Sequence, residues 1–112
     1  LKIIEACENI SLLSGEEDDT HHHEEETEEE HAHGDVNAHA WMSVSAYETQ
    51  VQTIADGLSG ADPERSSAYQ NGAKAYLEKL DGLRKRQEKL KQEISGQSVI
   101  LFHEAYAYVA ED

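Results

Sequence analysis

Apolar residues recur at helical spacing in two stretches of the chain. The first stretch predicts an amphipathic helix over about 44–59, capped at its start by Ser43 or Ser45 and ended by Gly60. Its apolar positions are Val44, Tyr47, Val51, Ile54 and Leu58. Because these positions are three or four residues apart, they share one side of a helix, and we expect that side to be buried.

The second stretch predicts a helix of about 30 residues, roughly 45 Å long, over about 62–95. Asp62-Pro63-Glu64 is a typical helix start, because proline needs no amide partner there and acids favour the positive end of the helix dipole. The apolar stripe consists of Tyr69, Ala73, Tyr76, Leu80, Leu83, Gln87, Leu90 and Ile94. Since the first helix can cover only about half of this stripe, we expect the fragment to self-associate.

Two short apolar segments, about 2–6 and 98–102, predict β-strands, and the residues after the second segment predict a short helix over about 103–110. Two strands so far apart in the sequence cannot build a sizeable sheet by themselves. The expected fold class is therefore mainly α, with one or two short strands. This order of elements suggests a piece of a larger α/β protein.

The negative charge of the chain is concentrated in one segment. The formal net charge is -15, and residues 16–33 contain ten of the 24 acidic residues, no lysine or arginine, and five of the seven histidines. Repulsion at this density, with no apolar face to offset the entropy of ordering, predicts a disordered loop over 16–37 in the absence of metal. So acidic a chain excludes nucleic acids and anionic lipid surfaces as partners.

Targeting and redox signals are sparse. No run approaches the roughly 18 apolar residues of a membrane span, and the apolar start is too short for a signal peptide. Either the protein is cytosolic or a targeting segment before Leu1 has been removed. Cys7 is the single cysteine, which excludes an intramolecular disulfide and a cysteine-rich zinc finger.

The histidines are candidate metal ligands of two kinds. Five of them lie among carboxylates in the acidic segment, a combination that suits a borderline cation such as Zn²⁺. These are His21, His22, His23, His31 and His33. They could collect metal in many interchangeable arrangements, or the segment could be a solvated polar tract.

His39 and His103 each have an apolar setting beside an aromatic residue. Taken singly, either could be an ordinary core or capping histidine. The lengths of the predicted elements favour a pair. The chain runs about 24 Å away from His39 along the first helix, returns about 45–50 Å along the second and doubles back about 17–20 Å along a strand. His103 should then lie near His39.

Several local motifs follow one another along the chain. They are Cys7-Glu8-Asn9-Ile10, the acidic histidine-rich loop, Asn37-Ala38-His39-Ala40-Trp41-Met42-Ser43, Ala61-Asp62-Pro63-Glu64, Asn71-Gly72-Ala73-Lys74-Ala75-Tyr76-Leu77 and Phe102-His103-Glu104-Ala105-Tyr106-Ala107-Tyr108. In this order they resemble the central part of the zinc- and manganese-binding proteins that serve metal ABC importers. That family has two α/β lobes joined by one long helix, with the metal held between the lobes.

The resemblance implies a place for each segment of the chain. Residues 1–15 would end the N-terminal lobe, 16–37 would be the loop, 38–61 would carry the first ligand motif and its helix, 62–96 would be the interlobe helix, and 97–112 would begin the C-terminal lobe. It also implies an extracytoplasmic receptor that captures a metal ion and delivers it to a membrane permease. Members with a histidine-rich loop are generally zinc importers, which favours Zn²⁺ over Mn²⁺.

By the same resemblance, His39 and His103 match two of the family's metal ligands. Asn37 and Ala38 stand where the family usually has aspartate and proline, which puts the rigidity of this loop in doubt. A further histidine and a carboxylate of the family's site lie outside this chain. Because a tetrahedral zinc site needs three or four protein ligands, the site is incomplete unless the acidic loop, Glu104 or a second chain contributes.

Three functions remain open from the sequence. The first is a zinc receptor of an ABC importer, the second is a zinc buffer or sensor that acts through the acidic loop, and the third is a helical self-association module without specific metal binding. An enzyme is not expected, because the sequence contains no His-Glu-x-x-His motif, glycine-rich phosphate loop or nucleophile elbow. Replacing His39 and His103 separates the first function from the second.

Overall fold

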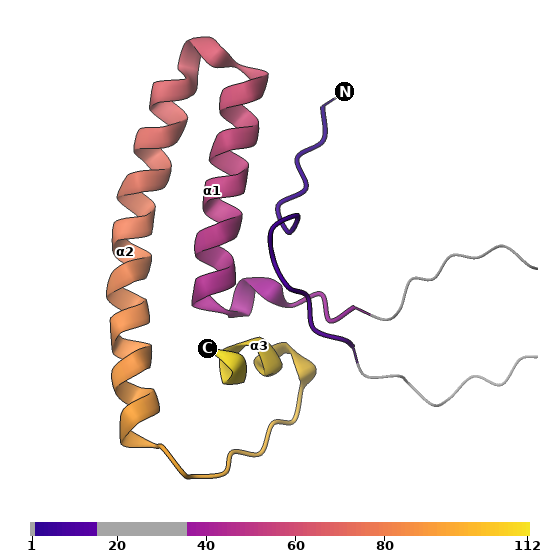
Figure 1. Cartoon of the computed structure of the whole chain (residues 1–112), viewed down its shortest axis with the longest axis vertical. Coiled ribbons are helices and arrows are strands. Elements are labelled where there is room, and N and C mark those ends of the chain that lie inside the picture. The colour runs from indigo at the N-terminus through magenta and orange to yellow at the C-terminus, as the bar shows by residue number, and fades with distance from the viewer. Residues whose placement is uncertain (1, 16–35) are drawn as a thin grey trace, which may run out of the picture.

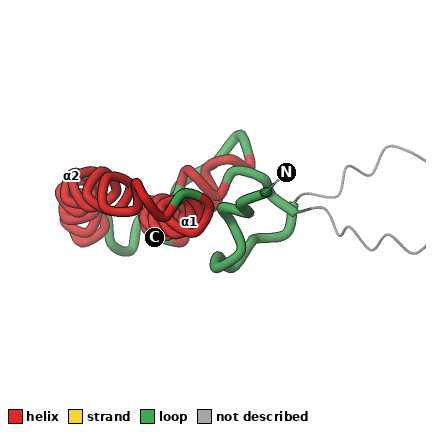
Figure 2. The backbone as a smooth tube through the Cα atoms, turned by 90° about the horizontal axis from the view of Figure 1, so that it is seen from above, coloured by secondary structure: helices red, strands yellow, loops and turns green. Residues whose placement is uncertain are grey.

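The computed structural model describes residues 2–15 and 36–112. Two helices, α1 and α2, run side by side in opposite directions, and a short C-terminal helix, α3, lies at the start of α1 (Figure 1). Viewed from above, α1 lies between α2 and the N-terminal segment (Figure 2). In chain order the elements are η1 (Ala40–Met42), α1 (Val44–Ala61), η2 (Pro63–Arg65), α2 (Ser66–Glu93), η3 (Glu104–Tyr106) and α3 (Ala107–Glu111), where η marks a single 3₁₀ turn.

α1 begins where the sequence predicts. The Ser43 hydroxyl accepts a hydrogen bond from the Ala46 amide at 3.0 Å, so Ser43 is the N-cap. The end differs from the prediction, because Gly60 lies inside the helix. Asp62 ends α1 with φ -138° and ψ 79°, since the ring of Pro63 disfavours helical geometry in the residue before it.

α2, with η2 before it, confirms the predicted long helix. Ala73 and Leu80 are its buried residues, on the face that packs against α1. Tyr76 meets Tyr47 of α1 edge to face, with ring centroids 6.1 Å apart. Gly96 follows the helix with φ 80°, a left-handed conformation that glycine adopts without strain.

Much of the apolar stripe of α2 remains exposed. α1 has 18 residues and α2 has 28, so roughly 15 Å of α2 extends beyond α1. Leu83, Leu90 and Ile94 are among the exposed large apolar side chains. The stripe is not a membrane span: no helix in the described part of the chain has both the length and the apolar character to cross a bilayer.

The predicted strands over 2–6 and 98–102 are wrong. Neither segment is a strand, and the ladder pairing among the described residues is one isolated antiparallel bridge between Ser14 and Val36. A β-strand needs a neighbouring backbone to pair with, and apolar content alone does not supply one. The side chain of Phe102 is 96% exposed as a result. The predicted short helix over 103–110 is confirmed as η3 followed by α3.

The expectation of disorder over 16–37 concerns mainly residues 16–35, which lie outside the described residues. At the end of this segment, Asn37 is 1% exposed. The doubt about the rigidity of this loop is likewise not supported at Asn37, because hydrogen bonds hold its side chain and backbone.

Candidate metal centre

His39 and His103 lie beside one another, as the element lengths predicted. Their imidazole centroids are 5.2 Å apart and the ring planes are nearly perpendicular, at 87°. The Trp41 ring lies 5.3 Å from that of His39. Each histidine is the N-cap of a 3₁₀ turn, His39 of η1 and His103 of η3, and the two turns are in contact. Two motifs of similar local structure therefore bring the two rings together.

A buried asparagine joins these two motifs. The Oδ1 atom of Asn37 accepts a hydrogen bond from the His39 amide at 3.0 Å and lies 2.9 Å from His39 Nδ1. Its Nδ2 atom donates to the Glu104 carbonyl at 2.8 Å. The Tyr108 hydroxyl donates to the Asn37 carbonyl at 2.8 Å and accepts from the Leu13 amide at 2.9 Å. All these groups are thereby held in one hydrogen-bonded network at the foot of α1.

Asp112 closes the same junction from the end of α3. Its carboxylate accepts hydrogen bonds from the hydroxyls of Ser43 and Ser45, at 2.8 and 2.5 Å, and from the Val44 amide at 2.7 Å. Burial acts to raise the pKa of Asp112, but the Ser45 and Ser43 hydroxyls and the α1 amides together lower it below its ordinary value. Lys91 of α2 donates to the Asp112 carbonyl at 2.6 Å. α1, α2 and α3 therefore meet at one residue.

Sequence reasoning missed the structural roles of Asn37 and Asp112. Both act through contacts with residues far away in the sequence, such as the hydrogen bond between Asn37 and Glu104 and that between Asp112 and Ser43. The one local signal at Asn37 is its place two residues before a candidate ligand.

The described residues bring two candidate zinc ligands together, His39 and His103. The Glu104 carboxylate lies 3.8 Å from His39 Nδ1, the same ring nitrogen that Asn37 contacts. Within residues 2–15 and 36–112, no three histidine, cysteine, aspartate or glutamate side chains form a group that could hold a metal ion. The loop histidines lie outside the described residues; they are His21, His22, His23, His31 and His33.

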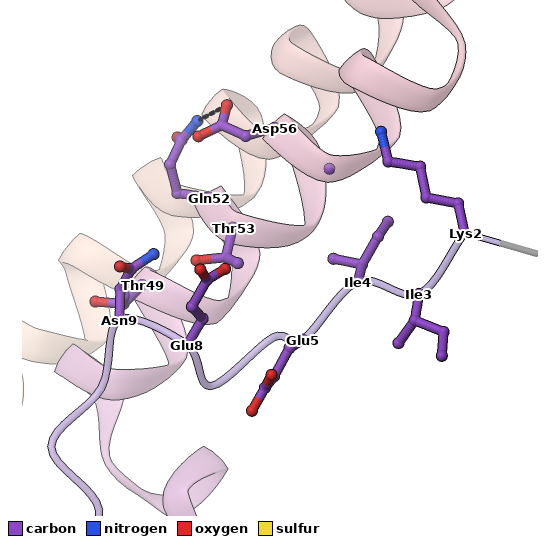
Figure 3. A pocket seen from close by; sticks show the side chains of 11 residues that line it. Lys2, Ile3, Ile4, Glu5, Glu8, Asn9, Thr49, Gln52, Thr53 and Asp56 are labelled. Carbon is purple, nitrogen blue, oxygen red and sulfur yellow. Dashed lines mark hydrogen bonds between the residues drawn. The ribbon is translucent and has the colours of Figure 1, made fainter.

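One pocket lies away from the two histidines. It has a volume of about 370 Å³ and lies between the N-terminal segment and α1. Its lining includes Lys2, Glu5, Glu8 and Asp56 (Figure 3). Asp56 accepts a hydrogen bond from Gln52 at 2.9 Å. Because the pocket has neither histidine nor cysteine and its carboxylates are not grouped around a common point, it is a poorer candidate for a transition metal than the histidine pair.

Two imidazoles lie beside one another near the start of α1, and imidazole is a ligand type that suits Zn²⁺. The comparison with known families agrees. The model of the family described as ZnuA, zinc-uptake complex component A, periplasmic, matches residues 1–112, and the chain belongs to this family. The resemblance to metal receptors is thus confirmed.

The names of the curated relatives refer to zinc. The chain is 35% identical over 75 residues to the high-affinity zinc uptake system protein ZnuA of Brucella abortus, which covers 67% of this chain and 22% of that protein. It is 30% identical over 112 residues to the zinc-binding lipoprotein AdcA of Streptococcus pneumoniae serotype 4, which covers all of this chain and 22% of that protein. The chain thus spans about a fifth of the length of these relatives. No solved structure matches it significantly.

Proposed function

We propose that this chain is the central part of an extracytoplasmic zinc receptor, which captures Zn²⁺ and delivers it to the membrane permease of an ABC importer. The observation that carries the proposal is the meeting of His39 and His103, with ring centroids 5.2 Å apart, in a chain of the zinc-uptake family. Zn²⁺ is favoured over Mn²⁺, because imidazole suits zinc whereas manganese prefers oxygen ligands. The family is one of transport components, so we propose no catalytic activity.

The location follows from the relatives. The family is described as periplasmic, and one relative that matches the whole chain is a lipoprotein. Both descriptions support an extracytoplasmic receptor. His39 and His103 are two of the three or four ligands that a zinc site requires. In the isolated chain, water or a second chain would complete the coordination, and in a longer receptor other parts of the protein would.

Zinc titration calorimetry on three variants tests the proposal. In the loop-asparagine variant the five histidines of the acidic segment are replaced (H21N, H22N, H23N, H31N and H33N). The second variant is His39→Ala, and the third is His103→Ala. The receptor proposal expects the tightest zinc-binding step to survive in the loop-asparagine variant and to be lost in each of the other two.

The alternative function is a zinc buffer or sensor that acts through the acidic loop. It is favoured by the concentration of five histidines and ten carboxylates within residues 16–33. Under this alternative the three variants behave in the opposite way. All binding disappears in the loop-asparagine variant, while His39→Ala and His103→Ala bind zinc as the unchanged chain does.

We also propose that the isolated chain self-associates through the exposed stripe of α2. Leu83 and Leu90 share one face of α2, Ile94 follows them at its C-cap, and all three lie at the end of the helix that α1 covers least. Light scattering on the chain and on a Leu83→Ser, Leu90→Ser double variant measures this. We expect a molar mass above that of a monomer for the former and a monomer for the latter.

A further inference from the structure

The hydrogen bonds around Asn37 fix the orientation of its side-chain amide. Oδ1 faces the His39 backbone amide, which can only donate, and Nδ2 faces the Glu104 carbonyl, which can only accept. Exchanging the two amide atoms would place a donor against a donor and an acceptor against an acceptor. The assignment of oxygen and nitrogen in this side chain therefore follows from the network.

This orientation decides which nitrogen of His39 carries the proton. Asn37 Oδ1 lies 2.9 Å from His39 Nδ1 and can only accept, so Nδ1 must donate. In the neutral imidazole the proton is then on Nδ1, and the lone pair is on Nε2. A lone pair on Nε2 is what a metal ion requires of this ring, and no proton has to move before it binds.

His103 is arranged in the opposite way. Its Nδ1 accepts a hydrogen bond from the Ala105 amide at 3.0 Å, which caps the η3 turn. The neutral His103 ring therefore carries its proton on Nε2. A metal ion can bind this ring only after the bond to Ala105 is given up. The two histidines of the pair thus differ in how far the protein has prepared them as ligands.

Asn37 also ties the prepared ring to the rest of the junction. Its side chain bonds to Glu104, the residue that follows His103, and its backbone carbonyl accepts from buried Tyr108. A movement of Asn37 would therefore alter the tautomer of His39 and the separation of the two rings together. The side chain is 1% exposed, so water cannot replace these bonds without opening the junction.

We propose that Asn37 is a positioning residue for zinc capture, whose amide holds His39 as the Nδ1–H tautomer and so presents Nε2 to the metal. The part of this proposal that concerns zinc capture rests on the proposed function. The tautomer does not, because it can be observed in the metal-free protein.

Nitrogen NMR of the imidazole rings tests the tautomer, on the metal-free chain with the five loop histidines replaced by asparagine. In the neutral form of each ring, we expect His39 to be protonated on Nδ1 and His103 on Nε2. Two further variants carry Asn37→Asp or Asn37→Ala in the same background. Aspartate keeps an acceptor for His39 Nδ1 but loses the donor to the Glu104 carbonyl, so the Nδ1–H tautomer should persist while that bond is lost. Alanine removes the acceptor, so His39 should shift toward the Nε2–H tautomer.

Zinc titration of the same variants measures the consequence. A hydrogen-bond partner of a metal-bound histidine typically contributes about 10–100-fold in affinity, and we expect a loss of this size for Asn37→Ala. Circular dichroism verifies that the variants are folded, and Asn37→Asp provides the comparison if Asn37→Ala is not.

Two results would overturn the proposal. The first is an unchanged chain whose His39 is protonated on Nε2. The second is an Asn37→Ala variant that is folded and has lost the Nδ1–H tautomer, yet binds zinc as tightly as before. Failure of the proposed function is recognised separately, because then His39→Ala leaves zinc binding unchanged. In that case Asn37 has no role in zinc capture. The tautomer of His39 can still be measured, because the nitrogen NMR experiment uses the metal-free protein.

Discussion

The buried residues of α2 are both apolar, whereas the buried residues where η1, η3 and α3 meet include polar side chains beside Ala40 and Tyr108. Ala73 and Leu80 represent the helix pair, and Asn37 and Ser43 represent the junction. Apolar packing stabilises in proportion to the area buried. A buried polar group contributes only while its hydrogen-bond partners stay in place, and each group left unsatisfied costs about 1–3 kcal/mol. The helix pair should thus respond to lost volume, and the junction to lost partners.

The largest effect is expected from Leu80→Ala in the helix pair. Leu80 is 7% exposed and is the one large apolar side chain of α2 that is buried. Its truncation should lower the free energy of unfolding by about 2–4 kcal/mol, because it leaves a cavity between the helices. Leu101→Ala is the matched control, since Leu101 is 43% exposed, lies outside the stripe of α2 and should cost less than about 1 kcal/mol. Urea denaturation at one fixed protein concentration measures both, and equal losses would contradict the account of the helix pair.

Tyr108→Phe tests the junction without changing its volume. The variant removes the hydroxyl that donates to the Asn37 carbonyl and accepts from the Leu13 amide. We expect a loss of about 1–3 kcal/mol, because both partners become unsatisfied in a buried place. Tyr106 is exposed, so Tyr106→Phe should change the stability by less than about 0.5 kcal/mol. Thermal unfolding of the two variants would refute this reading of the junction if both behaved alike.

Asp112→Asn should cost about 1 kcal/mol, the usual value of a helix cap. The effect should depend on pH. The hydrogen bonds at the start of α1 lower the pKa of Asp112 in the folded protein, so its stabilising contribution is present above the unfolded value of about 4 and is lost as the pH falls through the lower, folded value. Unfolding curves between about pH 2 and pH 7 measure the difference between the two proteins. A difference that does not shrink in acid would show that the charge of the Asp112 carboxylate does not stabilise the start of α1.

The smallest effects are expected when glycines of α1 and α2, which differ in what surrounds them, are replaced by alanine. Gly72 and Gly82 have nothing near the position of a Cβ atom, so replacement by alanine should stabilise α2 by up to about 1 kcal/mol each. At Gly57 a Cβ would lie 2.8 Å from two carbons of Ile4, so Gly57→Ala must displace that side chain. It should therefore stabilise the protein less than the other two replacements, or destabilise it. Melting temperatures rank the three, and a Gly57→Ala protein as stabilised as Gly72→Ala would contradict the packing of Ile4 on α1.

The two regions also differ in how far the sequence predicts them. The spacing of apolar residues, the Ser43 cap and the Asp62-Pro63 break are local signals, and they placed α1 and α2 within a few residues. The strand predictions failed because a strand depends on a pairing partner, which an apolar run does not reveal. The proximity of His39 and His103 followed from element lengths, although the segment before His103 is not the strand assumed.

The hydrogen bonds of the junction could not be predicted in the same way. Asn37 bonds to Glu104, which is 67 residues away in the sequence, and Asp112 bonds to Ser43, which is 69 residues away. No local periodicity encodes such pairs, since asparagine and aspartate are compatible with many turn and cap positions. Their roles depend on where the chain returns, which only the folded arrangement specifies.

The most direct test of the central claim is imidazole nitrogen NMR during a zinc titration of the loop-asparagine variant. His39 and His103 are the two histidines that this variant retains, so every histidine signal belongs to the candidate site. We predict that one nitrogen of each ring moves to the shift of a metal-bound imidazole as Zn²⁺ is added. Zinc that leaves both rings unchanged would contradict the claim that His39 and His103 form a zinc site.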